Sequence, residues 1–218
     1  MIRVCSGLKK LYRLCLLALL ILPGISESGW AQAPNVAAET GHGGRLETTY
    51  HGGLVTPPLP KPKFTLTDTS GTPFAFRSQT DGYVTLLFFG YTHCRSVCPT
   101  QMAFLASAMR RMPKDVVERF KVVFVTTDPA HDNPRLLRTW LNNFDKRFIG
   151  LTGSEAEVKA AQVAANVPAS AGNPAEHAAF VLAYTKDNLG HVIYPAGVTQ
   201  TDWLHDLPQL AREAWSDR

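Results

Sequence analysis

Two apolar runs separated by a helical pattern place the strongest constraint on the fold of this chain. The runs cover residues 83–91 and 121–127 and are rich in valine, leucine and phenylalanine. Such runs are typical of strands buried on both faces of a sheet. Between them, residues 99–112 carry apolar side chains at helical spacing, namely Met102, Leu105, Ala106, Met109 and Met112. The order strand, helix, strand predicts two parallel strands joined by a crossover helix.

The other predicted elements complete a mixed α/β domain. Residues 64–67 and 73–76 flank a turn cluster at 68–71, which predicts an N-terminal hairpin. Helices are expected over 134–144, 154–165 and about 201–215, and a second hairpin, expected at the sheet edge, joins 178–185 to 191–194. This order predicts a thioredoxin-like central sheet flanked by helices, with an added N-terminal β-hairpin.

The first 33 residues have the layout of an export signal. Basic residues precede the short apolar run 14–22, which Pro23 and Gly24 interrupt. The run is shorter than the ~20 residues that a membrane-spanning helix needs. We therefore expect a signal peptide, cut near residues 31–33, in preference to an N-terminal anchor. The protein is expected in the periplasm or on the outer face of the inner membrane.

Residues 34–63 are predicted to form a tether, and residues 64–218 the globular domain. The tether segment has an excess of glycine, threonine and proline and ends in the proline-rich run 57–62, which is typical of a flexible, partly extended linker. Loss of residues 1–33, with four basic residues and one acidic residue, lowers the formal net charge from +4 to +1. The charge therefore gives no reason to expect nucleic acid as a partner, and we expect a monomer.

Cys94 and Cys98 form the predicted functional centre, because Cys5 and Cys15 lie in the signal segment. Proline is favoured at the first position of a helix, so Pro99 predicts that Cys98 is the helix N-cap and Cys94 lies on the preceding loop. The helix N-terminus and the neighbouring Arg95 would both stabilise a thiolate. A purely structural disulfide is less attractive, because closing so short a loop removes little chain entropy. The thiols alone leave redox chemistry and metal binding open.

His177 precedes the strand expected at 178–185. Thioredoxin-like reductases carry a proline, usually cis, at that place, whereas the nearest proline here is Pro174. An imidazole facing two thiolates makes a soft, three-coordinate site suited to Cu(I), with Cu(II) tolerated if a further ligand joins. A lone loop histidine is more commonly just solvated.

From Pro57 onward the chain resembles the Sco/SenC family of copper-binding, thioredoxin-fold proteins that assist assembly of the dinuclear copper site of cytochrome c oxidase. The matching segments are 60–68, 87–94, 97–100, 126–129 with Pro134, and 176–177. The resemblance implies that Cys94, Cys98 and His177 are copper ligands and that Asp128 is an accessory residue. The chain departs from many members in two segments, with Arg95-Ser96 for Pro-Asp and Glu176-His177-Ala178 for Asp-His-Ser. Neither change removes a ligand.

The resemblance implies a copper chaperone that delivers one ion to an oxidase subunit. The alternative is an enzyme, a thiol:disulfide reductase that keeps the cysteines of that copper site reduced. Either function implies the oxidase subunit as a partner, with another periplasmic copper chaperone or a thiol reductant as a further one. A peroxiredoxin is excluded, because proline and threonine do not stand four and three residues before either cysteine.

The remaining histidines and Met102 are not expected to be ligands. His93 adjoins Cys94, but neighbours in an extended segment point to opposite sides. Met102 belongs to the apolar helical stripe and is assigned to the core. Two histidines lie in the tether, where only weak copper capture is conceivable, and three are interpreted as surface residues: His42 and His51, and His131, His191 and His205.

Overall fold

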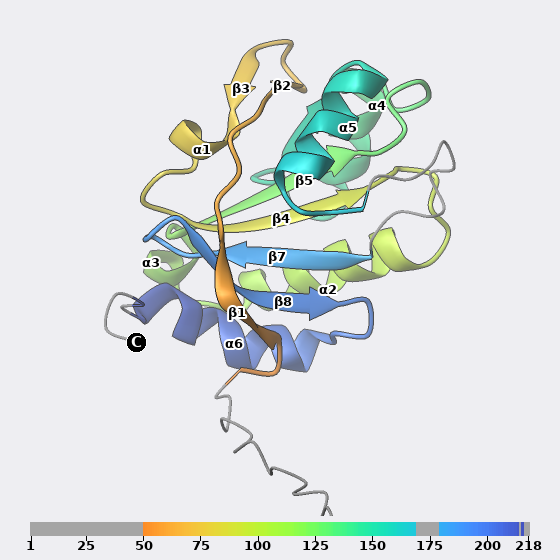
Figure 1. Ribbon diagram of the computed structural model, residues 1–218. Helices are drawn as coiled ribbons and strands as arrows, with labels where there is room; N and C mark the ends of the chain where they lie inside the picture. Colours follow the sequence, from red (N-terminus) through yellow and green to blue (C-terminus); the bar gives the residue numbers. More distant parts are fainter. Residues whose placement is uncertain (1–49, 169–178, 214, 216–218) are drawn as a thin grey trace, which may run out of the picture. The chain divides into compact units, whose positions relative to one another are not determined.

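The computed structural model describes residues 50–168, 179–213 and 215. Within these residues, eight strands form one sheet in the order β1-β8-β7-β4-β5-β6-β2-β3 (Figure 1). β4, β5 and β6 are parallel, and all other neighbours are antiparallel. The strands are β1 (Gly53–Pro60), β2 (Thr65–Asp68), β3 (Pro73–Ala75), β4 (Val84–Gly90), β5 (Phe120–Thr126), β6 (Ile149–Thr152), β7 (Phe180–Tyr184) and β8 (Leu189–Pro195).

Helices contribute to a separate core on each face of the sheet. α2, α4 and α6 bury apolar side chains in one core, represented by Leu105, Leu137 and Leu207. α1 and α5 bury Phe76 and Val158 in the other core, together with the hairpin of β2 and β3. The helices are α1 (Phe76–Gln79), α2 (Val97–Arg110), α3 (Lys114–Val117), α4 (Pro134–Asn142), α5 (Glu155–Ala164) and α6 (Gln200–Arg212). The predicted α/β class, with its central sheet, flanking helices and N-terminal hairpin, is confirmed.

Local sequence explains where several elements begin. Every residue of β4 is buried, as a central strand covered on both faces requires. The Asn133 side chain accepts the backbone N–H of Leu136 at the start of α4, and Ser154 and Glu157 form a reciprocal capping box at the start of α5. These side chains satisfy N–H groups that have no partner inside the helix.

The structure corrects two predictions about the sheet edge. Residues 53–60, expected as the end of a flexible tether, form β1 and pair with β8, with Gly53 opposite Ile193 and Pro60 opposite Leu189. The hairpin of β7 and β8 therefore does not form the edge. Proline is acceptable in β1 because an edge strand has one unpaired side, where the missing N–H is not needed.

Three short elements were not predicted, namely α1, α3 and β6, each of which has only four residues. Short segments carry too few residues to establish a periodicity. Among the described residues, no helix is long and apolar enough to cross a membrane. The predicted signal segment, residues 1–33, lies outside the described part of the chain.

Candidate metal centre at the thiol pair

The two cysteines lie where β4 passes into α2. The helix N-cap is Ser96, so Cys98 is the second helical residue and not the N-cap, which corrects the sequence-based assignment. Pro99 therefore stands in the first turn but not at its first position. All N–H groups of the first turn lack helical partners, so proline costs little anywhere in it. The Cys98 side chain is fully buried, whereas Cys94 on the loop is half-buried.

Both cysteines are reduced thiols, and Cys98 forms a hydrogen bond with the Cys94 sulfur. Partial burial works to raise the pKa of Cys94. The backbone N–H groups of Cys98, Ser96 and Val97, together with the Cys98 thiol, outweigh burial and hold that pKa below its ordinary value. The expected thiolate stabilisation at the helix start is thus present. Its main source is backbone N–H groups, and the exposed Arg95 is not among the principal causes.

The pKa of Cys98 shifts in the opposite direction to that of Cys94. Burial raises the pKa of its thiol far above the ordinary value, and Cys94 raises it further, while the Tyr91 backbone opposes the shift. The pair is therefore asymmetric, with a nucleophilic thiol at Cys94 and a protonated, buried thiol at Cys98.

Tyr91 contributes to the site from the end of β4, a role that the sequence analysis missed. Its side chain forms a hydrogen bond with Cys94, and its pKa is raised by burial and by the charges of Cys94, Cys98 and Asp128. Asp128 therefore lies in the electrostatic environment of Tyr91. The available sequence signal was the place of Tyr91 in the segment matched to the Sco/SenC family.

Asp128 lies between two histidines. His93 Nε2 lies 3.2 Å from its Oδ2, and His131 Nδ1 lies 2.8 Å from its Oδ1. The carboxylate raises the pKa of His131 through this hydrogen bond and its charge. Sequence reasoning set both histidines aside, and their contact with Asp128 arises from loops that follow β4 and β5.

Asp132 links the loops that follow β4 and β5 through hydrogen bonds. Its carboxylate is fully buried and accepts three hydrogen bonds, from the Thr92 N–H at 2.9 Å, the Thr92 hydroxyl at 2.5 Å and the Thr126 hydroxyl at 2.7 Å. Thr92 precedes Cys94 by two residues. Asp132 is thus a positioning residue for the thiol loop, and the sequence analysis did not identify it.

His177, the third predicted ligand, lies outside the described residues. β7 begins three residues later, at Phe180. It runs antiparallel to β4 with Val181 opposite Phe88, so β7 begins at the end of the sheet where the thiol loop leaves β4. Met102 lies in the core with no exposed surface, as expected.

The fold and the site together define a class, namely a thioredoxin-like protein with two reduced thiols at the start of the helix after a central strand. The chain belongs to the SCO1/SenC family, whose profile matches residues 56–211.

Three relatives illustrate the match. The solution structure of apo Sco1 from Thermus thermophilus is 30% identical, with a TM-score of 0.65, over 74% of this chain and 96% of the other. The copper-bound structure of ScoI from Bradyrhizobium japonicum is 29% identical, with a TM-score of 0.60, over 70% and 99%. A Stutzerimonas stutzeri protein, whose name refers to copper binding, is 33% identical over 107 residues, which are 49% of this chain and 52% of that protein. The chain thus spans about half the length of this curated relative.

Proposed function

We propose that this chain binds one copper ion through Cys94, Cys98 and His177 and delivers it to the copper site of a cytochrome c oxidase subunit. The observation that carries the proposal is the hydrogen-bonded pair of reduced thiols, one of which has a lowered pKa. Thiolates are the ligands that Cu(I) prefers. Copper is present in the related Bradyrhizobium structure, and the Sco family is described as a family of cytochrome c oxidase assembly proteins.

The geometry also supports His177 as the third ligand. Because β7 starts at the thiol end of β4, a residue three positions earlier can reach at most ~10 Å from that start. A neutral imidazole would complete a three-coordinate site. Asp128 would act beside the ion and not on it, through His93 and His131.

An anaerobic Cu(I) titration of the reduced chain against a competing chelator tests this proposal. One ion per chain is expected, with binding lost in Cys94→Ser and Cys98→Ser and weakened at least about tenfold in His177→Ala. His191→Gln, which removes an imidazole bonded to Asp187 and distant in sequence from the thiols, serves as the matched control and should bind Cu(I) normally. Unchanged affinity in His177→Ala would contradict the proposed ligand set.

A second function, thiol:disulfide reduction, is favoured by the asymmetry of the thiols. The Cys94 thiolate would attack a substrate disulfide, form a mixed disulfide and release one substrate thiol. Cys98 would then lose its proton and attack Cys94, releasing the second substrate thiol and leaving a Cys94–Cys98 disulfide. The two functions separate experimentally, since reduction of a model disulfide should survive His177→Ala and high-affinity copper binding should not.

The location of the protein is part of the proposal. We infer export to the periplasm or to the outer face of the inner membrane from the basic and apolar pattern of residues 1–33. Cell fractionation, with mass spectrometry of the N-terminus, tests export and distinguishes a cleaved signal from a retained anchor.

A further inference from the structure

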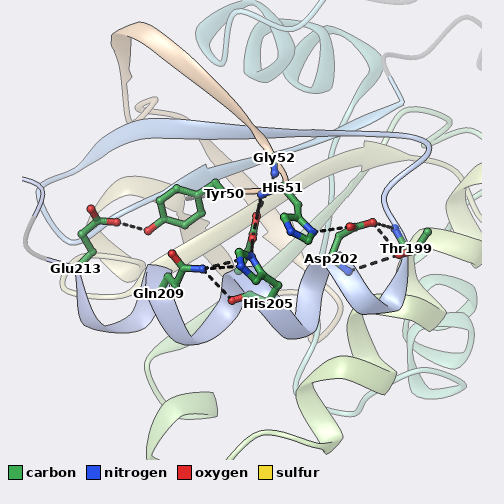
Figure 2. A network of polar contacts seen from close by, with 9 residues as sticks. Tyr50, His51, Gly52, Thr199, Asp202, His205, Gln209 and Glu213 are labelled. Atoms are coloured by element: carbon green, nitrogen blue, oxygen red, sulfur yellow. Dashed lines mark hydrogen bonds and ion pairs between the residues drawn. The ribbon is translucent and has the colours of Figure 1, made fainter. Parts of the chain in front are cut away.

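A second cluster of metal-ligating side chains lies between the start of β1 and α6. His51 precedes β1, and His205 lies on α6 (Figure 2). Asp206 is the next residue of that helix. One ligand atom from each of these three residues lies within 4.8 Å of the other two. The cluster uses none of the elements that carry the thiols.

Asp206 is the buried member of this cluster. Its carboxylate is fully buried and accepts the backbone N–H of His51 at 3.0 and 3.1 Å and that of Gly52 at 3.0 Å. These bonds hold the chain entering β1 against α6. The same backbone donors fix the orientation of the carboxylate before any ion arrives.

The two imidazoles are also oriented. Their rings stack with centroids 4.0 Å apart and planes inclined by 13°. His51 Nδ1 lies 2.7 Å from Asp202 Oδ1, and His205 Nδ1 lies 2.6 Å from Asp206 Oδ1. A neutral imidazole has one donor and one acceptor nitrogen. With its proton on Nε2, the His205 ring would offer Nδ1 to an ion beside Asp206 Oδ1, and with its proton on Nδ1, the His51 ring would offer Nε2. The contact of His51 with Asp202, which is not a member of the cluster, is the usual arrangement behind a metal-binding histidine.

The side chains have the freedom to close around an ion. Ligand atoms at ~2.0–2.1 Å from a metal stand at most about 4 Å apart, so the cluster must contract slightly. The side chains of His51 and His205 are 44% and 43% exposed, respectively, and can rotate towards an ion without disturbing the core.

We propose that His51, His205 and Asp206 form a second metal site, which binds one Cu²⁺ ion and, more weakly, Zn²⁺. Two imidazole nitrogens and a carboxylate oxygen suit a divalent ion of borderline softness, and a position remains for water. The order of affinities follows from the general preference of nitrogen and oxygen sites for Cu²⁺ over Zn²⁺. The site would thus take oxidised copper, whereas thiolates prefer the reduced ion, and the bound ion would join the start of β1 to α6.

The test uses the chain with Cys94→Ser and Cys98→Ser, because these changes remove the thiol site and prevent reduction of Cu²⁺. Titration with Cu²⁺ against a competing chelator should show one tight ion, with nitrogen couplings in its electron paramagnetic resonance spectrum. His51→Ala and His205→Ala should each weaken binding at least about tenfold. The matched control is His191→Gln, which removes an imidazole that is likewise bonded to a carboxylate, Asp187, but lies outside the cluster.

Several outcomes would overturn the proposal. These are the absence of a tight Cu²⁺ ion, a spectrum without nitrogen couplings, or equal affinity in the parent and in both cluster variants. Zn²⁺ gives a second readout, since a ligand that binds only the folded state raises the unfolding temperature. The rise should occur in the parent and in His191→Gln and be absent from His51→Ala and His205→Ala, and an equal rise in all four would contradict the site.

Discussion

The sulfur of Cys98 occupies space that only a glycine at position 90 leaves free. A Cβ atom on Gly90 would stand 2.8 Å from Cys98 Sγ and within 3.1 Å of the rings of Phe88 and Phe124. Gly90 ends β4 and Cys98 is the second residue of α2, so the buried thiol packs directly against the backbone of the central strand.

The first prediction concerns this contact. Gly90→Ala should force the Cys98 side chain or the strand end to move, lowering the free energy of unfolding by about 1–3 kcal/mol and weakening Cu(I) binding. Urea unfolding and chelator competition measure the two effects. Gly197→Ala is the matched control, because a Cβ there meets no atom within 4 Å. Similar behaviour of both variants would show that the close approach is unimportant.

The second prediction concerns the two thiols. Iodoacetamide at neutral pH should alkylate Cys94 and leave Cys98 unmodified until the chain is unfolded, because only Cys94 has a lowered pKa and any exposure. Peptide mass spectrometry identifies the modified residue. Arg95→Asp should change the rate of Cys94 alkylation only slightly, because backbone N–H groups and not Arg95 lower the Cys94 pKa. A large effect of Arg95→Asp would restore the thiolate-stabilising role that the sequence analysis gave to Arg95.

The third prediction concerns Asp132. Asp132→Asn keeps the size of the side chain but turns one acceptor oxygen into a donor facing Thr92 or Thr126. A buried hydrogen bond lost in this way costs about 1–3 kcal/mol, and the thiol loop should lose its position, so Cu(I) affinity should also fall. Glu118→Gln, in an exposed pair with Lys114, should change neither quantity. Normal copper binding in Asp132→Asn would contradict the positioning role.

The fourth prediction concerns the buried Lys61, whose ammonium donates to the Thr80 carbonyl at 3.0 Å and the Thr85 hydroxyl at 3.3 Å. Burial lowers the pKa of Lys61 from 10.5 to about 8. Between these two values the unfolded chain holds the proton and the folded chain does not, so stability rises with pH there.

Lys61→Met removes this titration. Relative to that variant, the parent protein should therefore gain about 2 kcal/mol in free energy of unfolding between pH 7 and pH 10. Urea unfolding of both proteins at the two pH values measures the difference. Parallel pH dependence of the two proteins would mean that the Lys61 pKa is not lowered.

The fifth prediction concerns His131. Its pKa is raised by the hydrogen bond and charge of Asp128, so the folded state should favour the imidazolium. This contribution is fully present below the unfolded pKa of about 6.5 and disappears as the pH rises through the folded value. Nuclear magnetic resonance titration of the imidazole should show a raised pKa that falls in Asp128→Asn. An unchanged pKa in that variant would contradict the contact.

Much of the fold follows from local sequence. The buried runs and the helical stripe between them correspond to β4, β5 and α2, with ends within a few residues of those predicted. Serine at position 154 marked the start of α5 correctly. The start of α2 was predicted wrongly from Pro99, because proline is tolerated throughout the first turn of a helix.

Only part of the site could be predicted from the sequence. The thiol pair was visible as a motif, and Asp128 came from family resemblance. The roles of Tyr91, His93 and Asp132 were not visible, because each depends on which loops meet at the carboxyl ends of β4 and β5. No periodicity in the chain encodes that meeting.

The sequence by itself determined the central strands, the crossover helix and the two cysteines, because hydrophobic periodicity and motif spacing are properties of neighbouring residues. Only the tertiary structure decided that a proline-rich segment becomes β1, that Lys61 is buried, and that His51 stacks on His205. These features join residues far apart in the chain. The approach of Cys98 to Gly90 is of the same kind, since it depends on how α2 packs against β4 and not on either residue's neighbours.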